Sequence, residues 1–474
     1  MNAYIVVDLG FGDSGKGLLT DFLVRHTGAT IVVRYNGGAQ AGHNVVTPEG
    51  VHHTFAQFGA GSFVPGVRTF LSRHVVIHPT ALLVEARALE EKGVPNVFGR
   101  IRISERALVT TPFHQAAGCI RELARGAARH GSCGVGVGET IKDALEHTKD
   151  VIVAGDLRNA TTLGHKVRRV RERKCDQMRA LVAATAANPR LDREIAVIES
   201  DAVGQAWIEQ ATSIAKLGLV VSDATLAEWM ARADSVVFEG AQGVLLDEWF
   251  GFHPYTSWSS STPANALELL SEYAPGASIE RIGIVRSYLP RHGPGPLPTE
   301  TNAFRAAVFD HNRENEWQGP VRYGWPDMVL TRYALDSVRG LDTIALTHLD
   351  VVGRMPTWRV CAGYRLTPRP PDAELVAEHT AQGLVTRLIA PQGRSLDRQV
   401  RLAEMLLHAT AVFKDCKPNE DAVLRLVERL LGRNVGIVSR GPRAKDVSFR
   451  RRIMPPSRMS RSPKCDVTSK TGRE

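Results

Sequence analysis

The sequence predicts an α/β fold in which a mainly parallel central sheet is covered by helices. Short apolar, β-branched runs alternate along the 474 residues with longer segments of helical periodicity. Glycine-rich loops follow several of these runs, at 36–43, 131–138, 240–243 and 293–295. This alternation is typical of parallel sheets, whose ligands bind where the loops gather at the carboxyl ends of the strands.

The first unit is a strand, a glycine-rich turn and a helix. Residues 5–9 are mostly apolar and β-branched, and residues 10–17 read Gly-Phe-Gly-Asp-Ser-Gly-Lys-Gly. Residues 18–25 then have apolar side chains at helical spacing. Glycines let backbone N–H groups approach phosphate oxygens, and a helix N-terminus favours an anion. The unit therefore predicts a phosphate site of the P-loop type.

This loop differs from an ordinary P-loop at one position. That motif places Ser or Thr after its lysine to hold Mg²⁺, whereas Gly17 follows Lys16 here. The only acid within the loop is Asp13, and an acid beside phosphates needs a cation or a proton-transfer role. The loop therefore predicts an enzyme that does chemistry on its phosphates.

The remaining elements continue the alternation. We expect strands at 31–34, 69–72, 151–154, 235–238, 281–285, 343–346 and 434–438. We expect helices at 82–92, 113–128, 166–187, 202–217 and 396–413. No repeat or linker interrupts this order, so we expect one catalytic domain over residues 1–449, with helical segments inserted between strands.

Composition is that of a globular protein, with 43% hydrophobic and 23% charged residues. Residues 440–474 hold 11 Lys or Arg and 3 Asp or Glu, so most of the net charge of +9 lies at this end. We therefore expect a disordered basic tail over residues 450–474 and no nucleic-acid partner. The six cysteines form no C-x-x-C pair, which argues against a disulfide framework or a zinc site. No run approaches the roughly 18 apolar residues of a membrane span, so we expect a cytoplasmic protein without a membrane partner.

Three further segments suit nucleotide chemistry. His43 follows a glycine-rich turn, where an imidazole handles a phosphate or a proton, although an isolated histidine is more often a surface or capping residue. Residues 238–243, Phe-Glu-Gly-Ala-Gln-Gly, lead from a strand into a tight turn. Asp350 follows another strand, where a carboxylate either accepts the paired N–H donors of guanine or caps a helix.

In this order, the segments resemble the adenylosuccinate synthetases, which are GTP-dependent ligases that join aspartate to inosine monophosphate. The resemblance spans about residues 3–447. The family has Glu in place of Ser14, Asn in place of Gln40 and Lys in place of His348. The matching motifs are Gly-Asp-Ser-Gly-Lys-Gly at 12–17, Gln-Ala-Gly-His at 40–43, Phe-Glu-Gly-Ala-Gln-Gly at 238–243, Gly-Pro-Leu-Pro-Thr-Glu at 295–300, Thr-His-Leu-Asp at 347–350 and Ser-Arg-Gly-Pro at 439–442.

The resemblance implies Mg²⁺ as cofactor, GTP as co-substrate and a homodimer. Asp13 would remove the proton from the purine N1 and bind Mg²⁺ together with the Gly42 carbonyl. His43 would act as an acid while the γ-phosphoryl group moves to the purine 6-oxygen, and Gln242 would orient the purine. The residues implied to contact GTP are Gly12, Gly15, Lys16, Gly17, Asp350, Ser439 and Gly441. Those implied to contact the other substrates are Gln40, Ser132, Cys133, Ser257 and Arg322.

Two substrate loops depart from the family. Gly-Arg-Arg-Arg-Arg-Thr-Gly-Trp, which clamps the aspartate carboxylates, reads Gly-Pro-Val-Arg-Tyr-Gly-Trp at 319–325. Arg322 is its one remaining arginine, with Arg291 and Arg332 as reserve candidates for carboxylate binding. The phosphate loop Gly-Thr-Thr-Gly reads Gly-Ser-Cys-Gly at 131–134. Lys149 is the nearest match to the arginine that the family donates across its dimer interface.

Three functions fit this pattern. The first is ligation of aspartate to inosinate, in purine nucleotide biosynthesis. The second is a diverged paralogue that acts on another 6-oxopurine nucleotide or another amine, because the arginine loop is reduced. The third is a non-catalytic, GTP-binding regulatory protein. The retained Asp13 and Gln242 argue against the third, because a pure GTP-binding module needs neither.

Overall fold

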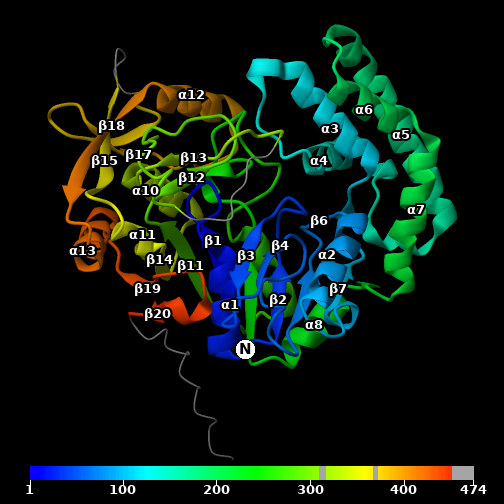
Figure 1. Cartoon of the computed structure of the whole chain (residues 1–474), viewed down its shortest axis with the longest axis horizontal. Helices are drawn as coiled ribbons and strands as arrows, with labels where there is room; N and C mark the ends of the chain where they lie inside the picture. Colours follow the sequence, from blue (N-terminus) through cyan, green and yellow to red (C-terminus); the bar gives the residue numbers. More distant parts are fainter. Residues whose placement is uncertain (309–315, 367–371, 451–474) are drawn as a thin grey trace, which may run out of the picture.

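The computed structural model describes residues 1–308, 316–366 and 372–450, and its centre is a ten-stranded sheet (Figure 1). The strand order is β20-β19-β14-β11-β1-β10-β2-β5-β7-β9. Neighbours run parallel, except for β19 and β20, which are antiparallel. The predicted α/β class is therefore confirmed. The strands are β1 (Asn2–Asp8), β2 (Ile31–Arg34), β5 (Arg68–Leu71), β7 (Ile101–Ser104), β9 (Val220–Val221), β10 (Ser235–Glu239), β11 (Ser278–Arg286), β14 (Thr343–Thr347), β19 (Val435–Ser439) and β20 (Val447–Phe449).

The central strands are buried on both faces. Ile5 and Val7 of β1 pack into one hydrophobic cluster, and Tyr4 and Val6 pack into another cluster with the apolar side of α1 (Lys16–Thr27). A strand that is covered on both faces reads as a continuous apolar run rather than as an alternating one. This is why residues 5–9 were recognisable as a buried strand.

Helices α3 to α7 form a helical lobe beside the sheet, inserted in the chain between β7 and β9 (Figure 1). The expected insertion of helical segments is confirmed. The lobe consists of α3 (Pro112–Arg125), α4 (Val137–Glu146), α5 (Ala160–Ala184), α6 (Pro189–Glu199) and α7 (Asp201–Lys216). The other helices are α2 (Pro79–Glu91), α8 (Ala224–Ala231), α9 (Ala264–Tyr273), α10 (Met328–Val338), α11 (Leu349–Val352), α12 (Leu396–Leu407) and α13 (Glu420–Leu431).

A second, antiparallel sheet has the order β16-β17-β15-β18, and the sequence did not predict it. Its strands are β15 (Trp358–Leu366), β16 (Val376–His379), β17 (Val385–Leu388) and β18 (Ala409–Cys416). The helix predicted over 396–413 is therefore wrong at its end. It stops at Leu407, because residues 409–416 pair with β15 instead of continuing the helix.

The strand predicted at 151–154 is also wrong. This segment makes one isolated bridge, between Leu108 and Val153, and then enters a 3-10 turn at Ala154–Arg158. Its apolar side chains fill the core instead of marking a strand, since Ile152 and Ala154 are buried in the cluster that also contains residues of α5 and α7. The other predicted strands and helices are confirmed, with ends shifted by a few residues.

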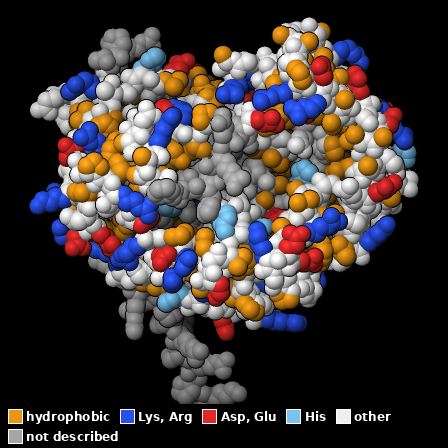
Figure 2. Space-filling model, viewed as in Figure 1, with side chains coloured by type: hydrophobic (Ala, Val, Ile, Leu, Met, Phe, Trp, Pro, Cys, Tyr) orange, Lys and Arg blue, Asp and Glu red, His pale blue; other side chains and the backbone are white. Residues whose placement is uncertain are grey.

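Three short pairs of strands complete the fold. They are β3 (His43–Val46) with β4 (His52–Phe55), β6 (Val76–Ile77) with β8 (Leu108–Val109), and β12 (Leu289–Arg291) with β13 (Arg322–Gly324). The predicted disordered tail at 450–474 lies outside the described residues, apart from Arg450. Within the described ranges, no helix has both the length and the apolar character to cross a membrane. Acidic and basic side chains are interspersed on the face shown in Figure 2.

Candidate active site

The loop between β1 and α1 borders a cavity of about 330 Å³. Gly12, Asp13 and Gly15 have positive φ angles of 92°, 56° and 101°, so the loop turns back on itself before α1 begins at Lys16. Such turns direct backbone N–H groups inward and form an anion-binding concavity. The predicted site residues that line the cavity are Asp13, Gly15, Lys16, Gly17, Gly42, His43, Asp350 and Gly441.

The structure explains why the P-loop hydroxyl is missing. Strand β3 crosses α1 at Gly17, and a Cβ atom there would lie 2.9 Å from both the Asn44 carbonyl oxygen and the His43 carbonyl carbon. Real Cβ atoms essentially never approach backbone this closely. The position that carries the Mg²⁺-binding hydroxyl in other P-loops is therefore used here to bring His43 against the phosphate loop.

Asp8 organises this loop, and sequence reasoning did not select it. Its carboxylate accepts hydrogen bonds from the backbone N–H groups of Gly10 (2.8 Å) and Ser14 (3.0 Å). It also forms an ion pair with Lys16, at 2.9 Å between Oδ2 and Nζ, and both side chains are buried. An acid that ends an otherwise apolar, buried strand is the signal that could have identified it.

Asp13 contacts a second residue that the sequence did not indicate. Oδ2 of Asp13 lies 3.0 Å from Nε2 of His292, and Arg286 donates a hydrogen bond of 2.5 Å to the Asp13 carbonyl oxygen. Burial alone would raise the pKa of Asp13. The hydrogen bond and charge of His292, together with the charges of Lys16 and Arg286, outweigh burial and lower this pKa. Asp13 is therefore ionised at neutral pH, as a proton acceptor must be.

His43 is buried and paired with Glu239 at the end of β10. Nδ1 of His43 lies 2.6 Å from Oε1 of Glu239, and the other Glu239 oxygen accepts a hydrogen bond from the Ala60 N–H at 2.9 Å. Nε2 of His43 has no hydrogen-bond partner within the described residues. Burial lowers the pKa of His43 below 6.5, and Glu239 offsets only part of this effect. The imidazole therefore has one fixed nitrogen and one that is available to a ligand.

Gln242 lies against the phosphate loop. Asn36 bonds both the N–H and the carbonyl oxygen of Ala241, at 2.7 and 3.1 Å, and Leu245 donates to the Gly10 carbonyl oxygen at 3.1 Å. The 36–43 and 240–243 loops thus meet beside the loop at 10–17. Oε1 of Gln242 and Oε1 of Gln40 are both buried without a hydrogen-bond partner among the described residues. Buried polar atoms are normally hydrogen-bonded, so both oxygens are candidates for contact with a bound ligand.

The far side of the cavity carries the residues implied to contact guanine. Thr347 bonds the Ser14 carbonyl oxygen at 2.7 Å, and this bond joins the end of β14 to the phosphate loop. Asp350 pairs with Arg354 at 3.2 Å through Oδ2, while its Oδ1 atom is buried without a hydrogen-bond partner in the described ranges. Ser439 does not line the cavity; its hydroxyl donates to the Gly441 carbonyl oxygen at 2.9 Å and shapes that turn.

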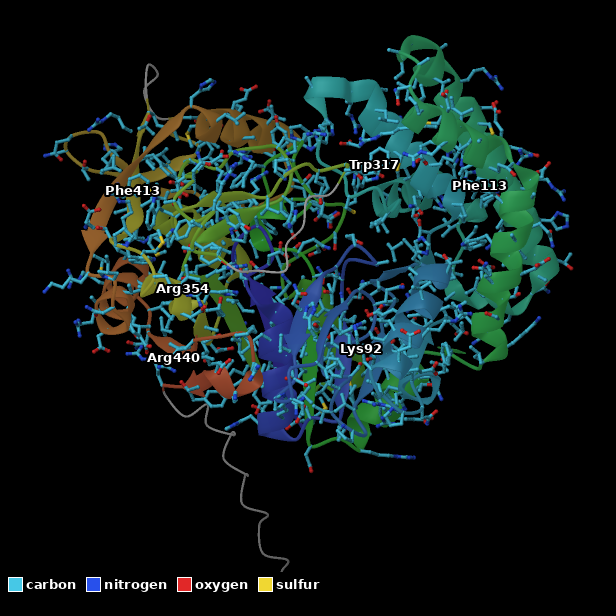
Figure 3. All side chains as sticks on the ribbon, viewed as in Figure 1. Lys92, Phe113, Trp317, Arg354, Phe413 and Arg440 are labelled. Atoms are coloured by element: carbon cyan, nitrogen blue, oxygen red, sulfur yellow. The ribbon has the colours of Figure 1, made fainter. Side chains whose placement is uncertain are left out.

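Ser132 and Cys133 lie apart from this cavity, on the loop that precedes α4. Glu122 accepts hydrogen bonds from the N–H groups of Gly131 (2.9 Å) and Ser132 (3.3 Å). Burial raises the pKa of Cys133, so its thiol stays protonated. Trp317 lies between the helical lobe and the rest of the molecule (Figure 3), and a Cβ atom at Gly134 would meet its ring at 2.6 Å. Gln318 also donates to the Gly131 carbonyl oxygen at 2.9 Å, so the residues just before the 319–325 loop contact the loop at 131–134.

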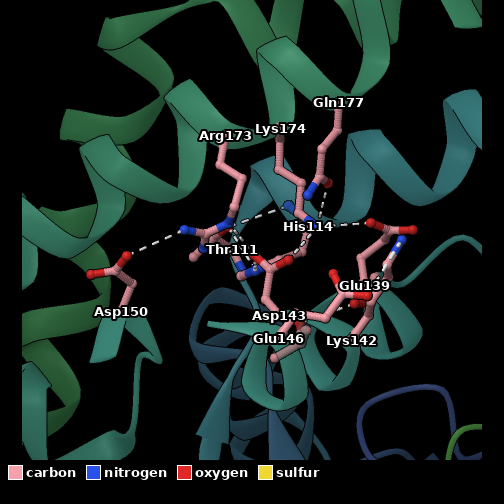
Figure 4. A network of polar contacts seen from close by, with 12 residues as sticks. Thr111, His114, Glu139, Lys142, Asp143, Glu146, Asp150, Arg173, Lys174 and Gln177 are labelled. Carbon is pink, nitrogen blue, oxygen red and sulfur yellow. Dashed lines mark hydrogen bonds and ion pairs between the residues drawn. The ribbon is translucent and has the colours of Figure 1, made fainter. Parts of the chain in front are cut away.

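A buried ionic network fixes α4, the helix that follows this loop (Figure 4). Nζ of Lys174, a fully buried residue on α5, lies 2.8 Å from Glu139 and 2.7 Å from Asp143, which are both on α4. Asp143 also contacts Arg173 at 2.8 Å and His114 at 3.2 Å. Helices α3, α4 and α5 are thus joined by buried ion pairs and hydrogen bonds.

The arginines expected to bind a substrate carboxylate already have protein partners. Arg322 forms an ion pair with Glu300 and donates to the Gly293 and Gly295 carbonyl oxygens, at 3.3 and 2.9 Å. Arg291 is buried over the Phe11 ring. Arg332 donates hydrogen bonds to the carbonyl oxygens of Leu430 and Thr386. Ser257 donates to the Leu246 carbonyl oxygen at 2.8 Å.

Comparison with known proteins identifies the family of the chain. The model of the family described as adenylosuccinate synthetase matches residues 5–448. The adenylosuccinate synthetase of Pseudomonas fluorescens (strain Pf0-1) is 32% identical over 443 residues, which cover 92% of this chain and 96% of that protein. The adenylosuccinate synthetase of Mycolicibacterium paratuberculosis is 31% identical over 478 residues, covering 96% and 99%.

Two solved structures share the fold. The adenylosuccinate synthetase of Plasmodium falciparum, solved in a fully ligated state, superposes with a TM-score of 0.74 at 19% identity, over 95% of this chain and 100% of that one. The succinoaminodeoxyadenylate synthetase of cyanophage S-2L, solved with dGMP and dATP, gives a TM-score of 0.56 at 17% identity, over 94% and 95%. Together with the family match, these findings show that the chain belongs to the adenylosuccinate synthetase family of carbon–nitrogen ligases.

Proposed function

We propose that the protein is a GTP-dependent ligase that joins L-aspartate to C6 of inosine monophosphate, giving adenylosuccinate, GDP and phosphate. The observation that carries this proposal is the convergence of Asp13, Lys16 and His43 on one cavity that Asp350 also lines. This arrangement supplies a proton acceptor, a phosphate-binding cation, a second proton-handling group and a guanine-reading carboxylate.

The chemistry proceeds in two steps. Asp13 removes the N1 proton of the purine, so that electron density moves onto the 6-oxygen, which attacks the γ-phosphorus while GDP leaves. The amine of aspartate then attacks C6, the phosphate departs with the former 6-oxygen, and the nitrogen releases one proton to solvent. Lys16, the loop amides and His43 lower the barrier of the first step by stabilising charge on the phosphoryl group.

The donor set of the cavity fits Mg²⁺. Asp13 and Gly42 both line the cavity. A carboxylate and a backbone carbonyl are the hard oxygen ligands that this ion prefers. Mg²⁺ commonly binds through one or two carboxylates plus phosphate oxygens, so these two groups would hold it against GTP. When bound, the ion supplies neutralisation of phosphate charge.

The test is mass spectrometry of a reaction that contains the purified protein, Mg²⁺, GTP, inosinate and aspartate. A succinyl-purine product, with equimolar GDP and phosphate, supports the proposal. The Asp13→Ala variant is the matched control, because it removes the proton acceptor and should abolish turnover while GTP affinity is largely retained through Lys16 and the loop amides. Bound GTP without product in the wild-type protein would contradict the proposed substrate pair.

A second candidate is a paralogue that uses another 6-oxopurine nucleotide or another amine. The pairing of Arg322 with Glu300 favours it, because a substrate carboxylate must displace Glu300 to reach that guanidinium. The same assay, run with guanylate, deoxynucleotides and other amino acids, distinguishes the two candidates. A non-catalytic, GTP-binding role is not favoured, because family membership and the buried, ligand-ready Gln242 both point to an enzyme.

We also propose that the protein works as a cytoplasmic homodimer, as its family implies. The mass in solution, measured by light scattering after size exclusion, tests the dimer. The 51.8 kDa chain would give twice that mass if the proposal holds, and a monomer would contradict it.

A further inference from the structure

The phosphate-loop lysine is held by an acid that lies outside the loop motif. Asp8 ends β1 and is 1% exposed, and its two oxygens accept four hydrogen bonds. The donors are the Gly10 N–H (2.8 Å), the Ser14 N–H (3.0 Å), the Ser14 hydroxyl (2.8 Å) and Nζ of Lys16 (2.9 Å). One carboxylate thus fixes both the loop and its lysine.

A buried ammonium group needs such a partner. Lys16 is 4% exposed, and its pairing with Asp8 is the one ion pair that it makes within the described part of the chain. Without an acid, a buried lysine either loses its proton or leaves its position. Asp8 therefore decides where the Lys16 ammonium lies before any nucleotide arrives.

Position 14 faces the same carboxylate. The Ser14 hydroxyl touches Oδ1 of Asp8, while Lys16 touches Oδ2. The family motif carries glutamate at this position. Because Ser14 and Lys16 contact the same carboxylate, a longer acidic side chain at position 14 would lie within reach of the Lys16 ammonium group. The serine is short enough to leave room for Asp8 and adds a hydrogen bond to it.

We propose that Asp8 is the positioning residue for Lys16, and that in this chain it replaces the acid that the family motif places at position 14. The inference rests on the proposed function, in which Lys16 binds the GTP phosphates. An ammonium group that is already fixed loses little rotamer freedom when phosphates arrive, and preorganisation of this kind improves both binding and transition-state stabilisation.

The test is an exchange of the acid between the two positions. Asp8→Asn removes the charge at nearly constant volume. Asp8→Asn combined with Ser14→Glu returns a carboxylate to the loop from position 14. Asp21→Asn is the control, because Asp21 is an equally buried carboxylate on α1 that pairs with Arg25 and does not touch Lys16.

Two quantities are measured for each protein, at fixed Mg²⁺. The dissociation constant of a fluorescent GTP analogue should rise about tenfold in Asp8→Asn, and kcat should fall about a hundredfold, as when one preorganised donor is lost. KM for inosinate should not change. The double variant should recover most of both losses, and the control should match the wild type.

Other outcomes overturn the inference. The inference is wrong if Asp8→Asn binds the analogue and turns over like the wild type. It is also wrong if the double variant is as impaired as Asp8→Asn. A double variant that is folded yet no better than Asp8→Asn would show that Asp8 acts only through the loop N–H groups. If Asp8→Asn does not fold, the double variant must fold and bind the analogue, and failure to do so refutes the exchange.

The outcomes also separate the two proposals. A wild-type protein that binds the GTP analogue without turnover refutes the proposed reaction, while the pattern of dissociation constants still decides the role of Asp8. Normal turnover in the wild type without recovery in the double variant refutes the role of Asp8 alone. A protein that binds no GTP analogue refutes both.

Discussion

Nδ1 of His43 lies 2.6 Å from Oε1 of Glu239, and both side chains are buried. A carboxylate accepts hydrogen bonds, so Nδ1 carries the proton and the lone pair of the neutral ring lies on Nε2. Burial lowers the pKa of His43 below 6.5, so the ring is neutral at pH 7 in the free protein. To donate a proton toward a phosphoryl group, His43 must first acquire one.

We therefore expect GTP binding near pH 7 to be accompanied by proton uptake. The phosphates bring negative charge to a buried imidazole and raise its pKa, so up to roughly one proton is taken up per GTP bound. Calorimetric titrations in buffers of different ionisation enthalpy measure this number. The His43→Asn variant should show no such uptake, and equal heats in all buffers for the wild type would contradict the prediction.

Restoring the hydroxyl of an ordinary P-loop should damage this protein. In Gly17→Ser, the new Cβ atom meets backbone atoms of His43 and Asn44 at 2.9 Å, and relieving such overpacking costs about 1–3 kcal/mol. Urea unfolding should show this loss of stability, together with reduced turnover. Gly164→Ala on α5, where nothing lies within 4 Å of a new Cβ atom, is the control and should not be destabilised.

Asp350→Asn should abolish the preference for GTP over ATP. The buried Oδ1 atom of Asp350 has no hydrogen-bond partner within the described residues, and guanine offers two N–H donors where adenine does not. Hydrogen bonds to a charged group contribute about 1.5–3 kcal/mol, so kcat/KM for GTP should fall at least tenfold while that for ATP changes little. Asp342→Asn, which removes a surface partner of Arg281, serves as control. An unchanged GTP/ATP ratio in Asp350→Asn would refute the assignment.

Lys174→Met should destabilise the helical lobe. The substitution removes the lysine that Glu139 and Asp143 share. Removing one partner of a buried pair costs about 3–5 kcal/mol when the other charge is left unpaired. Arg121 and Arg173 still pair with these acids, so the loss should lie below that range. Hydrogen exchange of α3, α4 and α5 measures the effect. Lys142→Met, a half-buried lysine on α4 whose partner Glu146 is exposed, should have little effect, and equal protection in both variants would contradict the prediction.

The same network predicts a dependence of stability on pH. Burial opposes ionisation of Glu139 and Asp143, but Lys174, and for Asp143 also His114 and Arg173, lower both pKa values. Carboxyl groups with lowered pKa values stabilise the fold above their unfolded values, near pH 4, and lose this contribution as the pH falls further. Thermal unfolding between pH 7 and pH 3 should show a steeper loss in the wild type than in Lys174→Met.

Arg322→Met should raise KM for aspartate about tenfold or more, if Arg322 exchanges Glu300 for a substrate carboxylate, because a charged, bidentate contact is lost. KM for GTP should stay unchanged. Arg281→Met removes a similar pairing, with Asp342, beside the start of β14 and is the control. Initial rates at varied aspartate decide the matter: an unchanged KM would assign Arg322 to holding the turn at 293–295 instead.

The sequence by itself determined the phosphate loop, the main parallel strands and the family. These features depend on patterns within short segments: a β-branched run, a glycine-rich turn, a helical period and motifs in a fixed order. The predicted contacts of Asp13, Lys16 and Gly17 with phosphates are local properties of this kind. The chain order of the loops also indicated that they would gather at one edge of the sheet.

Only the tertiary structure decided which side chains assist these residues. His43 and Glu239 are separated by 196 residues, and Ser14 and Thr347 by 333, so no local pattern relates them. Residues 409–416 became a strand because β15 offers them a hydrogen-bonding edge, which outweighs their helical periodicity. Asp8 lies within an apolar run that indicated only a buried strand. Its contact with the Lys16 ammonium group depends on how the loop between β1 and α1 turns. Local propensity favours a helix or a strand in a given segment, but burial and long-range hydrogen bonding determine whether that element forms and what it packs against.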